Sequence, residues 1–198
     1  HEEPAGNLAF KIDHALKALP EEIEFITWLG DDDLITRDVN TSIEYLEQNP
    51  KTVLVYGSCD YIDMSGKKIG QNPSGNWAKK LMHFGPFLIP QPGSIWRREA
   101  FEAIGGIPTE MDMAFDFDLF ISLKQVGDFH FINQTTASFR WHPGSLSASK
   151  RTKSVMEAHR VRRKHYKGLA KLTWPIWEWA VITATFFAGR IVSIRLSQ

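Results

Sequence analysis

The sequence predicts an α/β domain followed by a helical tail. Segments with a helical period alternate with short β-prone runs, and the chain then ends in a basic and an apolar stretch that are both compatible with helix. With 198 residues, of which 43% are hydrophobic and 23% are charged, the chain is long enough to bury a core. We expect the domain to occupy residues 1–148 and the tail residues 149–198.

Four segments of the domain have the pattern of a helix. Residues 7–19 repeat apolar side chains near a 3.6-residue period, and Pro20 ends the pattern. Residues 38–49 begin at Asp38, a candidate N-cap, and place three apolar residues inward. The other two helices are each closed by glycine, residues 97–104 by Gly105-Gly106 and residues 116–126 by Gly127.

The predicted strands are short. Residues 52–56 (TVLVY) are almost wholly apolar, which is typical of a strand covered on both faces. A turn at Ser65-Gly66 indicates a hairpin or a strand end. Residues 70–94 mix Gly, Pro, Asn and Ser with large apolar residues, as in a packed functional loop. The remaining predicted strands are residues 24–29, 129–132 and 137–141.

Composition excludes several classes of site. The single cysteine, Cys59, rules out a disulfide framework and a Cys-rich zinc site, and it is expected to be buried and inert. The sequence contains no G-x-S-x-G elbow, P-loop or G-x-G-x-x-G element. The start at His1 has no signal-peptide pattern, and we interpret the amino end as cut.

The triplet Asp31-Asp32-Asp33 follows the first predicted strand. If the strand continues, its period of two sends Asp31 and Asp33 to one side and Asp32 to the other. Adjacent acids repel one another, and Mg²⁺ or Mn²⁺ would offset that cost because these ions prefer hard oxygen ligands. The alternative is a solvated acidic turn before the next helix.

Two further features bear titratable groups. Asp116 and Asp118 open a predicted helix, where they either cap it or, beside a cleft, provide a general base. Two residues on a helix at this spacing do not face one another, so they should divide their roles. His142 follows a predicted strand and precedes a Pro-Gly turn, where it contacts a metal or phosphate or makes an ordinary hydrogen bond.

Five blocks occur in order along the chain, namely FITWLGDDDLI (25–35), VYGSCDYID (55–63), IPQPGSIWRREAFEAIGG (89–106), AFDFDLFISL (114–123) and FRWHPGSLS (139–147). Together they resemble family 2 glycosyltransferases, and the resemblance covers roughly residues 5–148. It implies a partial GT-A fold, a mixed sheet flanked by helices in which a nucleotide-binding half precedes an acceptor-binding half. The family's opening strand and nucleobase-binding acids would precede residue 1, so the chain itself is expected to be catalytically incomplete.

The resemblance also implies roles for these acids. Asp33 would be the direct metal ligand, Asp31 would contact the ribose or the metal, and Asp32 would support them. Asp116 matches the catalytic base and Asp118 its neighbour, although Phe115 replaces the acid that usually precedes the base.

The implied reaction is transfer of a sugar from a nucleotide-sugar donor to a hydroxyl of a glycan or lipid-linked acceptor, with inversion and with Mg²⁺ or Mn²⁺. Gln91 and Trp96 would border the acceptor, or else support packing. The class suggests polysaccharide or cell-envelope assembly at the inner face of the cell membrane, without nucleic acid. The alternatives are a glycan-binding or assembly module and a metal-dependent nucleotidyltransferase, although the nucleotide loop of the latter is not visible.

The tail reverses the charge of the domain. Residues 1–149 hold 12 Lys and Arg against 21 Asp and Glu, whereas residues 150–198 hold 11 against 2. The apolar, Trp-rich run 172–189 follows the basic segment and is short for a membrane span. We expect residues 150–196 to lie at a membrane surface, with burial against the missing amino-terminal part and a true span as alternatives.

Overall fold

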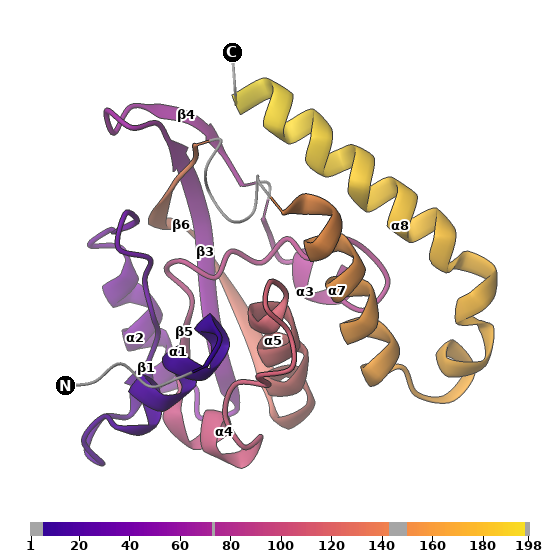
Figure 1. Cartoon of the computed structure of the whole chain (residues 1–198). Helices are drawn as coiled ribbons and strands as arrows, with labels where there is room; N and C mark the ends of the chain where they lie inside the picture. The colour runs from indigo at the N-terminus through magenta and orange to yellow at the C-terminus, as the bar shows by residue number, and fades with distance from the viewer. Residues whose placement is uncertain (1–5, 73, 143–149, 197–198) are drawn as a thin grey trace.

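The computed structural model describes residues 6–72, 74–142 and 150–196. Within these residues a mixed six-stranded sheet is flanked by helices and followed by two tail helices, which confirms the predicted fold class (Figure 1). The strands are β1 (Phe25–Ile26), β2 (Leu34–Ile35), β3 (Thr52–Ile62), β4 (Lys68–Gln71), β5 (Ile95–Arg97) and β6 (Asp128–Arg140). The helices are α1 (Leu8–Lys17), α2 (Val39–Gln48), α3 (Ala78–Leu81), α4 (Arg98–Ala103), α5 (Phe115–Val126), α7 (Arg151–His165) and α8 (Gly168–Leu196).

The long strand β3 lies at the centre of the sheet. The strand order is β1-β5-β3-β6-β2; β3 runs parallel to β6 and antiparallel to β5, and β4 pairs with its end. Leu54 and Tyr56 belong to the core on the α5 side, whereas Val55 packs with residues of α2 on the other side. Figure 1 shows α2 and α5 on opposite sides of β3. The prediction of a strand covered on both faces is therefore confirmed.

Two strand predictions were wrong in extent. β1 contains only Phe25–Ile26, so the chain leaves the sheet well before the aspartates. β6 is one continuous strand where two were predicted. Its pairing jumps from Tyr56 opposite Phe131 to Ser58 opposite Thr135, so β6 bulges within the polar stretch that had suggested a gap.

The predicted helices are all present. Asn7 caps α1, since its side chain accepts a hydrogen bond from the Phe10 N–H at 3.0 Å. Asp38 occupies the N-cap position of α2, but its side chain makes no capping bond there, so that part of the prediction was wrong. After α4, Gly105 and Gly106 both have positive φ, the conformation that glycine adopts without strain.

The hairpin and the cysteine also match the sequence. β3 and β4 form an antiparallel hairpin whose turn contains Gly66 at φ 86°. Cys59 is buried in β3, and burial raises the pKa of its thiol to about 12. A thiol with such a pKa stays protonated and unreactive at neutral pH.

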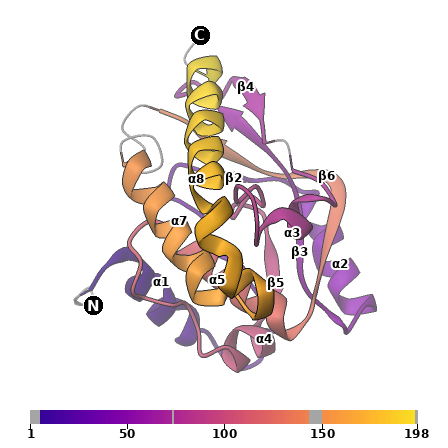
Figure 2. The same cartoon turned by 90° about the vertical axis from the view of Figure 1, so that its right-hand side faces the viewer.

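The tail helices pack against the domain and against each other. α7 lies along α5, and α8 turns back along α7 after Gly168, whose φ is 55° (Figures 1 and 2). Lys153 pairs with Asp112, and Lys164 lies 3.4 Å from Glu110. Part of the positive charge of the tail therefore faces acids of the domain.

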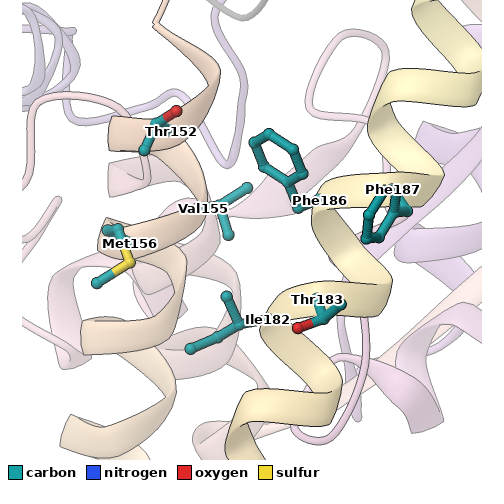
Figure 3. A pocket seen from close by; sticks show the side chains of 7 residues that line it. All are labelled: Thr152, Val155, Met156, Ile182, Thr183, Phe186 and Phe187. Atoms are coloured by element: carbon teal, nitrogen blue, oxygen red, sulfur yellow. The ribbon is translucent and has the colours of Figure 1, made fainter.

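The outer part of the tail is apolar. α7 and α8 border a cavity of about 230 Å³ lined by Thr152, Val155, Met156, Ile182, Thr183, Phe186 and Phe187 (Figure 3). On α8, several large apolar side chains are exposed to solvent, namely Leu169, Leu172, Ile176, Trp179 and Phe187. Among the described residues, no helix has both the length and the continuous hydropathy that a membrane span requires.

Candidate active site

The three aspartates lie in a turn between β1 and β2. The turn is closed by a hydrogen bond from the Asp33 N–H to the Gly30 carbonyl at 3.2 Å. Asp31 and Asp32 are exposed, whereas Asp33 is 9% exposed. The predicted alternation, with Asp31 and Asp33 on one side, was wrong because a turn does not have the period of a strand.

Asp33 is held at the carboxyl end of β6. Its Oδ1 atom accepts a hydrogen bond from the Arg140 N–H at 2.9 Å. Burial raises the pKa of Asp33; the bond from Arg140 opposes this shift, while the charges of Asp32 and Asp31 add to it. A cation beside the Asp33 carboxylate would offset the electrostatic cost of ionising this buried group.

Arg140 links this turn to the central hairpin. Its Nε atom donates to the Asp32 carbonyl at 2.9 Å, and its NH1 atom donates to the Asp63 carbonyl at 2.6 Å. The ends of β3 and β6 and the aspartate turn are therefore joined by one side chain. Nothing in the sequence by itself selects Arg140. A basic residue at the end of one strand can nevertheless indicate a site when acidic residues follow another strand.

His142, which the sequence suggested as a contact for a metal or phosphate, lies beside Asp32. Its Nε2 atom is 3.5 Å from Asp32 Oδ2, and both side chains are partly exposed. Within the described parts of the chain, no three His, Cys, Asp or Glu side chains are grouped closely enough to hold a metal ion. The donors present suit Mg²⁺ or Mn²⁺ shared with substrate phosphates, since such ions often use only one or two carboxylates.

Asp116 lies in the first turn of α5. Its Oδ1 atom accepts a hydrogen bond from the Phe117 N–H at 2.7 Å. Burial, opposed only in part by this hydrogen bond, raises the pKa of the Asp116 carboxyl to about 6. A carboxyl group with a pKa close to the working pH can accept a proton and later release it, as a general base must.

Asp118 has a different environment, two residues further along α5. It is fully buried and is contacted by two side chains of α7, Lys164 Nζ at 3.0 Å and His165 Nε2 at 2.6 Å. Burial alone would raise its pKa, but these hydrogen bonds and charges outweigh it and the pKa is lowered. The lowered pKa of Asp118 and the raised pKa of Asp116 show that the two carboxyl groups have different environments. The predicted division of their roles stays a prediction.

The hydrogen bonds around His165 define its tautomer. Lys167 can only donate, and its Nζ lies 2.9 Å from Gln125 Oε1, so the Gln125 amide nitrogen faces His165 Nδ1 at 2.7 Å. The imidazole accepts at Nδ1 and donates from Nε2 to Asp118. None of these partners of Asp118 was found from the sequence, because all lie in the tail.

Trp28 packs between the aspartate turn and α5. Its ring contacts Trp96 edge-on at 5.2 Å and Phe115 at 5.9 Å, and its carbonyl accepts a hydrogen bond from Gln91 Nε2 at 2.8 Å. Trp96 is 0% exposed, so of the two roles expected for it, the acceptor contact and packing, the structure supports packing in the core. Gln91 remains half-buried at the edge of this cluster.

These contacts link residues from all five sequence blocks. Trp28, Gln91, Trp96 and Phe115 form one cluster, and Arg140 joins the aspartate turn to the end of β3. The chain has a mixed sheet with an acidic turn at one strand end and an acid of raised pKa at the start of a neighbouring helix. This is a glycosyltransferase-like fold.

Comparison with known proteins defines the fold and not the family. No protein-family model and no curated protein sequence matches the chain. The crystal structure of Staphylococcus aureus TarS 1–349 in complex with UDP-GlcNAc superposes with a TM-score of 0.58 at 14% identity over 83% of this chain and 48% of TarS 1–349. TarS 1–349 alone gives a TM-score of 0.51 at 11% identity, over 89% of this chain and 56% of its own. The chain thus spans about half the length of the matched structure.

Proposed function

We propose that this chain is part of a glycosyltransferase that moves a sugar from a nucleoside-diphosphate donor to an acceptor hydroxyl with inversion at the anomeric carbon. The main support is Asp116 at the start of α5, whose pKa of about 6 suits a base, in a chain that also carries the acidic turn Asp31–Asp33. The fold shared with TarS, which was crystallised with UDP-GlcNAc, supports the same donor class. The resemblance to family 2 is part of the proposal.

In the proposed reaction, Asp116 removes the proton of the acceptor hydroxyl. The hydroxyl oxygen forms a bond to the anomeric carbon while the bond from that carbon to the diphosphate oxygen breaks. The nucleoside diphosphate leaves with the electron pair of the broken bond. Asp116 is then protonated, and a pKa near 6 allows the proton to return to water at neutral pH.

The acidic turn would bind the donor and a divalent cation. Asp33 and Asp31 would hold Mg²⁺ or Mn²⁺, with Asp32 and the adjacent His142 at the edge of the site. When bound, such an ion supplies positive charge to the departing diphosphate. The raised pKa of Asp33 favours this assignment, because a cation stabilises the ionised form that burial disfavours.

The acceptor would be a glycan or a lipid-linked sugar that approaches Asp116. Gln91 is the acceptor contact that we retain, because it is half-buried beside Trp28 whereas Trp96 exposes no surface. A role in polysaccharide or cell-envelope assembly follows from the family resemblance.

We also assign the outer face of α8 to a membrane surface, at the cytoplasmic side. Ile176 and Trp179 are 84% and 69% exposed, although such side chains are normally buried in a soluble helix. Trp residues favour the boundary between headgroups and acyl chains. Because Lys153 and Lys164 already pair with the domain, α8 and not the basic face of α7 would make the main contact.

The activity is tested with the protein as its gene encodes it, incubated with UDP-GlcNAc, a mixture of glycan acceptors and Mn²⁺. Release of UDP that is abolished by EDTA and restored by Mn²⁺ supports a metal-dependent transferase. UDP release that EDTA leaves unchanged would remove the metal from the proposal. Binding of glycans without any turnover of UDP-, GDP- or dTDP-sugars would instead identify a binding module.

A further inference from the structure

The N-cap residue of α5 provides no side-chain acceptor. Ala114 occupies the N-cap position, and an alanine side chain cannot accept a hydrogen bond. Ala114 is also buried, so water does not easily replace the missing acceptor. The first N–H groups of a buried helix need an acceptor from elsewhere in the protein.

Glu157 of α7 supplies this acceptor from 43 residues further along the chain. Its Oε2 atom accepts hydrogen bonds from the Met113 N–H at 2.7 Å and from the Ala114 N–H at 3.2 Å. The side chain is almost fully buried, with Lys153 at 3.8 Å from Oε1. A carboxylate at a helix amino end is also favoured by the helix dipole.

A second contact between α7 and the same helical turn involves Asp118. Lys164 and His165 bind its carboxylate, about two turns of α7 away from Glu157. Asp116 lies in sequence between the N–H groups that Glu157 binds and the carboxylate that Lys164 binds. α7 therefore fixes the backbone on both sides of Asp116.

We propose that Glu157 is a positioning residue for the reaction, because it holds the first turn of α5 and so orients the Asp116 carboxylate toward the acceptor. The inference rests on the proposed role of Asp116 as the base. In this proposal α7 supports the active site by holding the start of α5. The tail and the catalytic helix then act as one unit.

The expected effect of losing Glu157 follows from these contacts. Without an acceptor for the Met113 and Ala114 N–H groups, the first turn of α5 should fray, and Asp116, which is already partly exposed, should become more exposed to water. Misplacement of a reacting group by about 1 Å can cost about a hundredfold in rate. Donor binding depends on the separate acidic turn, so the donor KM should stay nearly constant.

The test compares Glu157→Ala, Glu157→Gln and the control Arg160→Ala, which changes an exposed residue of the same helix. Steady-state kinetics with UDP-GlcNAc are measured across pH on the protein as encoded. For Glu157→Ala we expect kcat to fall about ten- to hundredfold, the donor KM to stay within about twofold, and the acid limb of kcat/KM to move to lower pH. Glu157→Gln keeps an oxygen acceptor and should stay within about threefold of wild type. Arg160→Ala should match wild type.

Wild-type kcat and pH profile in Glu157→Ala would overturn the inference, as would equal losses in Glu157→Gln and Glu157→Ala. If circular dichroism shows that Glu157→Ala is unfolded, Glu157→Asp replaces it, since it keeps the charge but withdraws the carboxylate by one methylene. Reduced kcat with a shifted acid limb in that variant supports the inference, and wild-type behaviour refutes it. The activity of Asp116→Asn is measured in parallel. If Asp116→Asn is fully active, Asp116 is not the catalytic base. If Asp116→Asn is inactive but Glu157→Ala behaves like wild type, only the positioning role of Glu157 is refuted.

Discussion

Replacing Asp118 with asparagine should destabilise the domain at neutral pH. The carboxylate is fully buried and has two donors from α7, so the change removes the negative charge opposite Lys164. Loss of one partner of a buried ion pair costs about 3–5 kcal/mol. Because the Lys164 side chain is 44% exposed and regains water, and because asparagine still accepts a bond from His165, we expect a loss of about 2–3 kcal/mol.

The same change at Asp116 is the matched control, and it should have the opposite sign. The folded-state pKa of Asp116 is about 6, above the ordinary value of 3.8, so the ionised carboxylate opposes folding at neutral pH. A shift of this size corresponds to about 3 kcal/mol at most. Since asparagine must still bury an amide, we expect Asp116→Asn to stabilise the protein by about 1–2 kcal/mol.

Urea denaturation followed by circular dichroism measures both effects. With a slope of about 2 kcal/mol per molar urea, the midpoint should fall by about 1–1.5 M in Asp118→Asn and rise by about 0.5–1 M in Asp116→Asn. The pKa of Asp118 is lowered in the fold, so its contribution is complete above the unfolded value and is lost as pH falls through the folded one. The Asp116→Asn gain should vanish between about pH 6 and pH 4, since wild type then binds the proton. Shifts of the same sign in both variants at pH 7 would refute this account of α5.

Three further results are expected. In a pH series of wild-type activity, kcat/KM should rise through about pH 6, where Asp116 loses its proton; a profile that is flat from pH 5 to pH 8 would contradict a base of raised pKa. Mn²⁺ binding measured by calorimetry in the presence of UDP should weaken at least tenfold in Asp33→Asn, because the change removes a charged oxygen ligand, and unchanged affinity would exclude Asp33 as a ligand. In flotation with anionic liposomes, the double variant of Ile176→Asp and Trp179→Asp should lose most of its binding, since it places charges on the exposed face of α8. Full binding by this variant would exclude α8 as the membrane contact. Arg160→Ala is the control.

Local signals were sufficient for most of the fold. The period of α1, the apolar run at the start of β3 and the glycines after α4 each depend on neighbouring residues, and each prediction was confirmed. The gap predicted within β6 shows where such signals fail. Its polar residues remain in the strand because they form a bulge opposite β3. At the bulge the two strands approach so closely that a Cβ atom at Gly57 would lie 2.5 Å from the Gln134 carbonyl oxygen. Only the pairing partner reveals that the strand continues.

The candidate site was predicted in part for the same reason. The acidic turn and Asp116 stand out in sequence because acids cluster beside apolar runs. In the structure, Trp28, which precedes the turn, contacts Phe115, which precedes Asp116. The sequence did not predict that Asp116 and Asp118 have different environments, since the difference depends on Lys164 and His165, which lie more than 40 residues away. The hydrogen bonds from Glu157 to the start of α5 could not be predicted either, because this contact between two helices leaves no recognisable pattern in the sequence of either helix.

The most direct test of the account compares the turnover of Asp116→Asn and Asp118→Asn, each shown to be folded at the assay temperature. Transfer from UDP-GlcNAc, or from whichever nucleotide sugar wild type uses, is measured with saturating Mn²⁺. If Asp116 is the base and Asp118 a structural partner of α7, Asp116→Asn should lose about 10²–10⁴ in kcat and Asp118→Asn should retain activity within about tenfold. Near-normal turnover in Asp116→Asn, or a greater loss in Asp118→Asn, would contradict the account.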